Sequence, residues 1–439
     1  MNLATLGHSS GQALASSWVS GFEPVVVLSA IALVLLVFQS SATAILLSRL
    51  LRGPSRYPPL SPQSPTPDLL GRVSVVVPTL NEAQRINPCL LGLTQQSYEL
   101  REVIVVDSYS QDGTPERVKA FGAFDPRFRL VNDDPLPPGW VGRPWALHNG
   151  FWQTSPASEW FLGIDADTQP QPGLVASLLK TAHAEGYDLI SLAPQFVLKT
   201  PGEIWLQPAL LVTLVYRFGP AGAGGETPER VMANGQCFLC RREVLAQLGG
   251  YIRAKGSFCD DVTLARQVAA AGYKVGFLDG TNVLKVRMYE GARETWQEWG
   301  RSLDLKDAAA FMQTIADVAF LLAVQGLPLL LAFAGLLAGW VGWATPTIWA
   351  ATALNGFLLA LRWGLLWAIA PAYDLQAATS AWLFWLSPLA DPLAWLRILL
   401  SASQKPKQWR GRSYPADMVE APTMGKTTAP TDGGSDREG

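Results

Sequence analysis

Long stretches without charge constrain this chain more than any other feature of its sequence. Residues 25–47 are 23 consecutive uncharged and mostly apolar residues. A helix needs roughly 20 such residues to cross the hydrocarbon core of a bilayer, so this segment predicts a transmembrane helix. Residues 318–361 are also uncharged, and a break near residues 339–346 predicts two further spans joined by a short turn. Residues 379–400 are hydrophobic too, but Pro and Asp residues interrupt them.

The basic residues near these segments indicate their orientation. Residues 1–24 contain no Lys or Arg, whereas Arg49, Arg52 and Arg56 follow the first segment. By the positive-inside rule, the chain after this helix is cytoplasmic. A second basic cluster at residues 405–412 follows the last segment, and three complete spans after a cytoplasmic domain would place it outside. We therefore expect the last hydrophobic segment to re-enter the membrane or to lie at its interface, unless the charge rule fails here.

Composition narrows the classes of function. Charged residues make up 16% of the chain and hydrophobic residues 49%, which is oily for a soluble protein. The formal net charge of −2 argues against nucleic-acid binding. Four cysteines are too few for a disulfide scaffold and fit a reducing compartment. Cys237 and Cys240 form C-x-x-C without a second pair or a nearby His, so we interpret them as apolar strand residues rather than as zinc ligands.

Short apolar runs rich in β-branched residues alternate with helical stretches between residues 72 and about 290. Strand–helix alternation predicts an α/β domain with a mostly parallel, Rossmann-like sheet that helices cover on both faces. Ligands of such sheets bind at the carboxyl ends of the strands. The apolar runs are residues 73–77, 102–106, 128–131, 160–164, 188–192, 235–240 and 273–278, and the helical stretches include residues 87–96 and 114–121.

Three polar motifs occupy the carboxyl ends of predicted strands. PTLNEA (78–83) follows the first strand, VVDSYSQDGT (105–114) ends the second and GIDADTQP (163–170) ends the fourth. In the last motif, Asp165 and Asp167 are two residues apart and point to the same side of an extended chain. Hard oxygen ligands of this kind suit Mg²⁺ or Mn²⁺ carrying a diphosphate, although a lone D-x-D is also compatible with a solvated turn. The three motifs in this order favour a ligand site.

Two further segments carry candidate functional groups. In LPPGWVGRPWALHNG (136–150), the glycines allow close backbone approach and Arg143 can pair with a phosphate. GSFCDDVTLARQ (256–267) places Asp260 and Asp261 before an amphipathic helix, which the two could simply cap. A neighbouring carboxylate also raises the pKa of one member of such a pair, which suits a general base.

Two segments between these regions are expected to face the membrane. Residues 201–217 are apolar over most of their length but too short to span, so we expect either an interfacial helix that walls a lipid groove or a core helix. Residues 293–311 mix Trp, Leu and Phe with charged residues, which predicts an amphipathic helix at the membrane surface.

The order PTLNEA, VVDSYSQDGT and GIDADTQP resembles the family 2 glycosyltransferases, whose fold is called GT-A, over residues 72 to about 310. The resemblance implies that Asp261 is the catalytic base and that Asp260 stands where the family has Glu. It implies that residues 234–245 form the acceptor-side strand with Gly235 next to the sugar, although a core strand is the alternative. It also implies that Trp299 stacks on the acceptor, unless it anchors the chain at the membrane interface. The implied nucleotide-sugar-binding residues are Pro78, Thr79, Asn81, Glu82, Asp107, Arg143 and Asp165, the metal ligands are Asp165 and Asp167, and the acceptor-binding residues are Gly235, Gln236 and Trp299.

The segment around Arg143 resembles the Gly-Trp-x-Gly-Lys-x-x-Ala segment of membrane-bound family members that act on isoprenoid lipids, although Arg143 replaces the Lys. These members include hopanoid-associated, diaponeurosporenoate and cyanobacterial carotenoid 2′-O-glycosyltransferases. WRGRSY at residues 409–414 resembles their terminal motif. Residues 296–302 read WQEWGRS and lack the Gln-x-x-Arg-Trp motif of the processive synthases, so we expect transfer of a single sugar.

We therefore expect a membrane-bound, inverting glycosyltransferase that uses Mg²⁺ or Mn²⁺ to move one sugar from a nucleotide-sugar to a lipid hydroxyl, with a carotenoid as the expected acceptor. The alternatives are another lipid (a glycerolipid, a hopanoid or a polyprenyl phosphate), a polysaccharide, or no catalysis at all in an inactive membrane scaffold. The expected organisation is an extracytoplasmic segment (1–24), a transmembrane helix (25–47), a Pro-rich linker (48–71), a cytoplasmic GT-A domain (72–290), an interfacial amphipathic helix (291–316), membrane helices (317–400) and a basic, then disordered tail (401–439).

Overall fold

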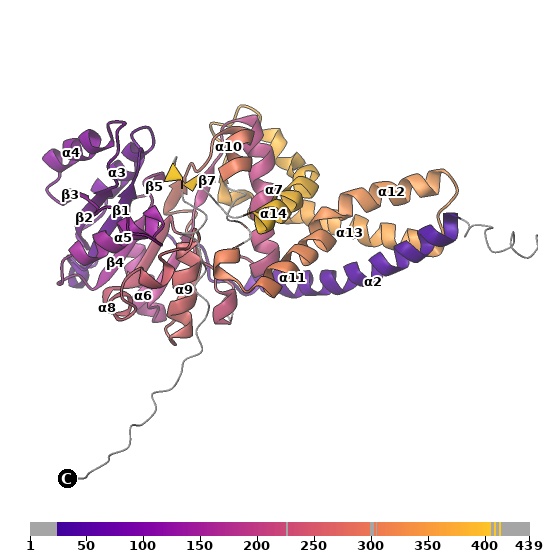
Figure 1. Ribbon diagram of the computed structural model, residues 1–439, viewed down its shortest axis with the longest axis horizontal. Helices are drawn as coiled ribbons and strands as arrows, with labels where there is room; N and C mark the ends of the chain where they lie inside the picture. Colours follow the sequence, from indigo (N-terminus) through magenta and orange to yellow (C-terminus); the bar gives the residue numbers. More distant parts are fainter. Residues whose placement is uncertain are drawn as a thin grey trace, which may run out of the picture.

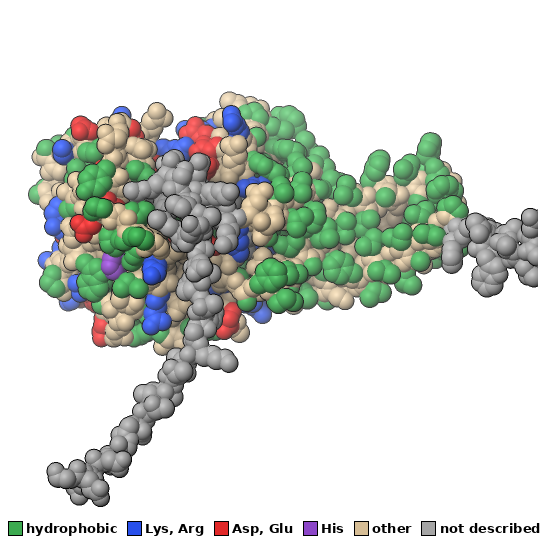
Figure 2. Space-filling view, in the orientation of Figure 1, with side chains coloured by type: hydrophobic (Ala, Val, Ile, Leu, Met, Phe, Trp, Pro, Cys, Tyr) green, Lys and Arg blue, Asp and Glu red, His purple; other side chains and the backbone are tan. Residues whose placement is uncertain are grey.

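The computed structural model describes residues 24–224, 227–298, 303, 305–404, 408–409 and 412–413. It consists of an α/β part and a group of long helices that project from it on one side (Figure 1). Charged side chains are spread over the α/β part, whereas the surface of the projecting helices is almost entirely hydrophobic (Figure 2). A continuous apolar surface of this kind suits contact with lipid rather than with water.

A seven-stranded sheet in the order β3-β2-β1-β4-β8-β6-β9 forms the core of the α/β part. The strands are parallel to their neighbours except β8, which pairs antiparallel with β4 and β6. Every residue of β1 and of β4 is buried, as expected of strands that are covered on both faces. The predicted mostly parallel sheet is confirmed. The strands are β1 (Val73–Thr79), β2 (Leu100–Asp107), β3 (Phe128–Asn132), β4 (Trp160–Ile164), β6 (Leu189–Ala193), β8 (Cys237–Arg241) and β9 (Val275–Asp279).

Separate hydrophobic clusters lie on the two faces of this sheet. Val75 and Val77 belong to the cluster that includes residues of α3, α4 and α6. Val76 points the other way and belongs to the cluster that includes residues of α5, α8 and α9. The alternation along β1 therefore covers both faces of the sheet with helices. The helices are α3 (Ile86–Thr94), α4 (Thr114–Phe124), α5 (Gly142–Gln153), α6 (Leu174–Glu185), α8 (Arg242–Gln247) and α9 (Asp260–Ala270).

A second, four-stranded sheet in the order β11-β7-β10-β5 was not expected from the sequence. Its strands have only two or three residues each, which is too short to leave an alternating pattern. Because β11 comes from the C-terminal part of the chain and pairs with β7, this sheet connects the α/β part to the helices. The strands are β5 (Thr168–Pro170), β7 (Gln195–Val197), β10 (Leu284–Val286) and β11 (Tyr373–Asp374).

Three helices in the described residues are long and apolar enough to cross a membrane, or up to four if one bent pair counts as a single span. α2 packs along α13, and α13 packs along α12, in the projecting group (Figure 1). α7 lies at the base of this group, where it contacts α10 and α14. The helices are α2 (Pro24–Leu50), α7 (Pro201–Phe218), α10 (Gly291–Glu298), α11 (Phe311–Leu321), α12 (Pro328–Trp340), α13 (Pro346–Ile369) and α14 (Asp391–Ser403).

The C-terminal helices differ in detail from the expectation. The predicted single amphipathic helix over residues 291–316 is wrong, because α10 ends at Glu298 and α11 begins only at Phe311, after an extended Ala310. α11 and its π-helical turn then meet α12 at an angle of 46°, so the first span predicted within residues 318–361 is bent and begins earlier. α14 lies beside α7 rather than at the tips of α12 and α13 (Figure 1). Residues 381–403, which include α14, are one of the three helical segments long and apolar enough to cross a membrane, so the interfacial or re-entrant placement stays a prediction.

The Pro-rich segment between α2 and β1 lies along the α/β part. The N–H of Tyr57 donates to the carbonyl of Gly222 and the N–H of Leu60 donates to that of Asp279, both over 2.8 Å. Leu60 is buried in the main core cluster. These contacts hold the end of α2 against the wall of the cavity described next.

Candidate active site

A cavity of about 1350 Å³ lies at the carboxyl ends of β1 and β4. This volume exceeds the roughly 300–1,000 Å³ of a typical small-molecule pocket. One wall is polar and comes from the loops that follow β1 and β4, from the segment before β8 and from the start of α9. The opposite wall is apolar and comes mainly from α7 and from the end of α13. The cavity thus lies between the α/β part and the hydrophobic helices.

The loop after β1 forms the first part of the polar wall. Pro78, Asn81 and Glu82 line the cavity, as predicted. Asn81 has a left-handed backbone conformation (φ 56°), which Asn tolerates better than most residues. The hydroxyls of Ser110 and Thr114 accept hydrogen bonds from the N–H groups of Asn81 (2.8 Å) and Glu82 (2.9 Å), so the loop after β2 fixes this conformation.

Thr79 and Asp107 lie beneath this loop and not in the wall of the cavity. Asp107 is fully buried and accepts hydrogen bonds from the Thr79 hydroxyl (3.0 Å) and from the N–H of Ser110 (2.8 Å). In this structure they support the two loops, and their contact with a nucleotide stays a prediction. Asp112 from the same motif does line the cavity and accepts from the N–H of Ala83 (2.9 Å). Sequence reasoning missed it, because the motif alone does not distinguish its acidic residues.

Asp165 and Asp167 follow β4 and face the same cavity, as their spacing predicts. Thr168, the first residue of β5, donates to the carbonyl of Asp165 through its N–H (3.2 Å) and its hydroxyl (2.8 Å). This turn holds the two carboxylates at the end of the strand. The Asp165 side chain remains 26% exposed, whereas Asp167 is buried.

Arg143 in the first turn of α5 connects the two halves of the polar wall. Its Nε and Nη2 both lie 2.9 Å from Oδ1 of Asp165. Its Nη1 forms an ion pair with Asp260, and its Nη2 donates to the carbonyl of Gly235 (2.7 Å). Although burial lowers the pKa of Arg143, the negative charges of Asp165, Asp260 and Asp261 keep that pKa well above its usual value. Arg143 therefore keeps its positive charge, and its guanidinium is already paired with the carboxylates of Asp165 and Asp260.

Asp260 and Asp261 form the first turn of α9, where the helix dipole favours negative charge. Asp260 is 2% exposed and is committed to Arg143, whereas Asp261 is partly exposed in the cavity. Burial raises the pKa of Asp260 to about 7, although Arg143 acts in the opposite direction. Burial also raises the pKa of Asp261, again against Arg143. Only the second carboxylate is placed to meet a ligand in the cavity.

The D-x-D pair has the chemistry of a magnesium or manganese site that shares its cation with a ligand. No group of three or more His, Cys, Asp or Glu side chains that could hold a metal occurs in the part of the chain that the structure describes. Mg²⁺ is usually held by one or two carboxylates, with substrate phosphates supplying other oxygens. Asp165 and Asp167 are a donor set of that size, and a cation already contacts Asp165 in the form of the Arg143 guanidinium.

The predicted acceptor-side residues have two different places. Gly235 and Gln236 line the cavity. A Cβ atom at Gly235 would lie 2.4 Å from Nη2 of Arg143, so this glycine makes room for the guanidinium. Gln236 is buried and its N–H donates to the side chain of Asn234 (3.0 Å). Trp299 lies outside the described residues.

The apolar wall explains what the segment at residues 201–217 does. α7 is largely buried, so it is a core helix, and the side chains of its C-terminal half also face the cavity. The end of α13 and the segment after it close the same wall. The apolar wall includes Leu211, Val215, Phe218, Leu365, Ile369 and Tyr373.

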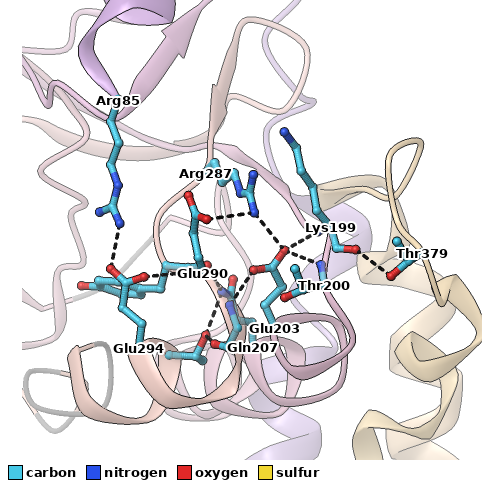
Figure 3. A network of polar contacts seen from close by, with 12 residues as sticks. Arg85, Lys199, Thr200, Glu203, Gln207, Arg287, Glu290, Glu294 and Thr379 are labelled. Atoms are coloured by element: carbon cyan, nitrogen blue, oxygen red, sulfur yellow. Dashed lines mark hydrogen bonds and ion pairs between the residues drawn. The ribbon is translucent and has the colours of Figure 1, made fainter. Parts of the chain in front are cut away.

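A polar network fixes α10 at the rim of the cavity (Figure 3). Glu203 of α7 accepts hydrogen bonds from the N–H of Thr200 (2.8 Å) in a capping box and from the N–H of Gly291 (2.9 Å) at the start of α10. Arg85, which follows β1, pairs with Glu294 of α10 over 2.9 Å. These contacts connect α7, α10 and the β1 loop, so the rim is tied to both walls.

The main sheet region matches a known family model. Residues 74–249 match the family described as glycosyl transferase family 2. Glycosyltransferase AglE of Haloferax volcanii is 35% identical over 133 residues, which are 30% of this chain and 41% of that protein. The 4,4'-diaponeurosporenoate glycosyltransferase of Staphylococcus haemolyticus is 25% identical over 232 residues, which are 53% of this chain and 60% of that protein. The chain thus spans less than two thirds of the length of these curated relatives.

A solved structure shares the fold over most of both chains. The mannosyltransferase PcManGT from Pyrobaculum calidifontis, determined in complex with GDP-Man and Mn²⁺, is 23% identical and superposes with a TM-score of 0.50. The superposition covers 86% of this chain and 98% of that one. Residues 74–249 therefore resemble glycosyl transferase family 2, and the fold of the chain is that of this solved GT-A glycosyltransferase.

Proposed function

We propose that this protein transfers one sugar from a nucleotide-sugar to the hydroxyl of a membrane lipid. The main support for this proposal is that a single cavity has one polar wall and one apolar wall. Its polar end holds the D-x-D and Asp261, and its apolar end is formed by α7, which is largely buried, and by the end of α13, which belongs to the projecting helices with a hydrophobic surface (Figure 2). A water-soluble donor and an acceptor that stays in the bilayer could meet at the boundary between them.

The charge of the cavity favours a donor that arrives with a divalent cation. Ten carboxylates and four arginines line it. Three of the arginines already pair with acidic side chains, namely Arg56 with Asp279, Arg85 with Glu294, and Arg143 with Asp165 and Asp260. A diphosphate would meet a predominantly negative wall, so its binding needs added positive charge. Asp165 and Asp167 would hold Mg²⁺ or Mn²⁺ at this position.

Asp261 is the proposed general base. It accepts the proton of the acceptor hydroxyl while the hydroxyl oxygen forms a bond to the anomeric carbon. The bond between that carbon and the diphosphate oxygen breaks, and the nucleoside diphosphate leaves with the electron pair. A cation bound at the D-x-D supplies positive charge that stabilises this leaving group. A single displacement of this kind inverts the anomeric centre. The raised pKa of Asp261 strengthens it as a base once it is ionised.

We infer that the acceptor is a lipid and, within that class, a hydroxylated carotenoid. The relative from Staphylococcus haemolyticus, whose printed name is a 4,4'-diaponeurosporenoate glycosyltransferase, supports this choice. The apolar wall offers no charged side chain to an acceptor headgroup, and the carboxylates near Asp261 would repel a phosphate. A neutral alcohol therefore suits the cavity better than a polyprenyl phosphate. The basic residues that follow α2 support a cytoplasmic catalytic domain.

The test is transfer of label from a donor panel. Membranes that contain the protein are incubated with radiolabelled UDP-, GDP- and dTDP-sugars, with and without EDTA, and lipids are extracted and identified. We expect one donor to label a neutral lipid, and we expect EDTA and the Asp261→Asn variant to prevent labelling. If every donor leaves the lipid fraction unlabelled, or if label enters a water-soluble product, the proposed function is wrong.

A further inference from the structure

Arg143 contacts Asp165, one of the two carboxylates expected to bind the cation. It reaches Asp165 from inside the protein, with Nε and Nη2 both 2.9 Å from Oδ1. The contact is built into the fold, because α5 presents Arg143 and Gly235 leaves the space for its guanidinium. The Nη2 hydrogen bond to the Gly235 carbonyl (2.7 Å) and the Asp260 ion pair restrain it further.

We propose that Arg143 makes the D-x-D a poor site for a bare divalent cation and a good one for a cation that arrives with a diphosphate. The proposal rests on the proposed function in that it takes the D-x-D as the cation site. A cation held by the Asp165 carboxylate would lie near the Arg143 guanidinium, which contacts the same carboxylate. Two neighbouring positive charges repel each other strongly in a partly buried site. A diphosphate bound to the same cation adds negative charge beside Arg143, so repulsion becomes attraction.

This arrangement couples the two ligands. If Arg143 makes the cation bind more tightly in the presence of the nucleotide, the cation must make the nucleotide bind more tightly by the same factor. Two of the three other arginines that line the cavity pair with acidic side chains away from the D-x-D, and the third, Arg293, is exposed on α10. Arg56 pairs with Asp279 (3.0 Å) and Arg85 pairs with Glu294 (2.9 Å), and neither pair includes the D-x-D. Arg143 is therefore a positioning residue that couples binding of the cation to binding of the diphosphate.

Mn²⁺ binding measures the coupling without catalysis. The full-length protein in lipid nanodiscs is titrated with Mn²⁺, and free Mn²⁺ is followed by electron paramagnetic resonance, alone and with UDP or GDP. Protein-free Mn²⁺–nucleotide samples serve as blanks. We expect one of the nucleotides to tighten Mn²⁺ binding to the wild type by about tenfold or more. We expect Arg143→Gln to bind Mn²⁺ alone about tenfold more tightly than the wild type and to lose most of the nucleotide effect.

Two other variants separate charge from structure. Arg143→Lys keeps the positive charge and should keep the coupling. Arg56→Gln removes a cavity arginine that is paired elsewhere and should bind Mn²⁺ as the wild type does. If Arg143→Gln does not fold, Arg143→Gln/Asp260→Asn removes the charge of both partners of the buried ion pair, and the same tightening is expected.

Specific results would overturn the proposal. It is wrong if the wild type binds Mn²⁺ equally well with and without both nucleotides, or if the folded Gln variant, single or double, binds Mn²⁺ no more tightly than the wild type. Neither outcome depends on sugar transfer. A wild type that shows the coupling but labels no lipid would instead contradict the proposed function.

Discussion

Two largely buried arginines pair with aspartates in different parts of this protein, and the contrast between them separates function from structure. Arg143 of α5 lies among Asp165, Asp260 and Asp261 beside a large cavity. Arg362 of α13 is also buried, but in the group of projecting helices. Among the described residues its ion-pair partner is Asp391, through Nε at 2.9 Å and Nη2 at 3.2 Å.

The difference lies in the balance of charge. The pair on α13 is one positive charge against one negative charge, with Ser387 and Gln325 as the neutral neighbours. It joins α13 to α14, and its two opposite charges balance each other. The cluster around Arg143 has more carboxylates than cations, and the excess faces a cavity. Uncompensated negative charge destabilises the folded protein. The excess at this cavity therefore indicates that a positively charged ligand binds there.

The largest expected effect is on activity, from Asp261→Asn. The amide keeps the shape of the side chain but cannot accept the proton, so turnover should fall about 10²- to 10⁴-fold. The melting temperature should not fall, because the variant relieves part of the excess charge. Lipid labelling and thermal unfolding check the two expectations. Asp188→Asn, which disturbs the surface pair with Arg241, is the control and should keep its activity. An Asp261→Asn variant with normal turnover would remove Asp261 from the mechanism.

The second effect is on stability, from Arg362→Met. It leaves Asp391 buried without its partner among apolar helices, which should cost about 3–5 kcal/mol of unfolding free energy. The double variant Arg362→Met/Asp391→Leu removes both charges and should recover most of that loss. Unfolding in detergent measures both. If the single variant is as stable as the wild type, the pair does not hold α14 in place, and the contrast with Arg143 is lost.

The third effect is on the pH dependence of activity. The active form of the base is ionised, and burial raises the pKa of Asp261 and that of Asp260, the latter to about 7. Activity should therefore fall on acidification at a higher pH than for an ordinary carboxylate with a pKa near 4. Arg143 lowers the pKa of both groups. Arg143→Gln removes this positive charge and should therefore move the fall in activity to higher pH, whereas Arg143→Lys keeps the charge and should move it less. Arg362→Lys should leave the acid side of the pH–activity profile unchanged. A shift in this variant would show that the profile does not report the ionisation of Asp260 and Asp261.

The sequence predicted the main sheet and the placement of Asp165 and Asp167 at one cavity, because long β-branched runs and the side-chain alternation along a strand are local signals. It also predicted that Asp260 and Asp261 share a helix start, but not their separate exposures, which depend on where Arg143 lies. That position is not local, since Arg143 and Gly235 are far apart in sequence and meet only through the sheet order. The second sheet was missed for a similar reason, because its short strands gain their partners from distant segments. The sequence did not show that Asp107 also supports the turn that follows its strand, and its predicted contact with a nucleotide stays a prediction.

The smallest expected effect comes from two glycines near the two arginines. At Gly235, an added Cβ would lie 2.4 to 3.0 Å from the guanidinium atoms of Arg143, which three contacts restrain. Gly235→Ala should therefore displace Arg143 and reduce turnover about tenfold, with a change in unfolding free energy of about 1 kcal/mol. At Gly364, an added Cβ would have no neighbour within 4 Å, so Gly364→Ala should leave turnover unchanged and stability equal or slightly higher. Turnover and unfolding measured on both variants test this, and equal turnover in the two would mean that the exact seat of Arg143 does not matter for catalysis.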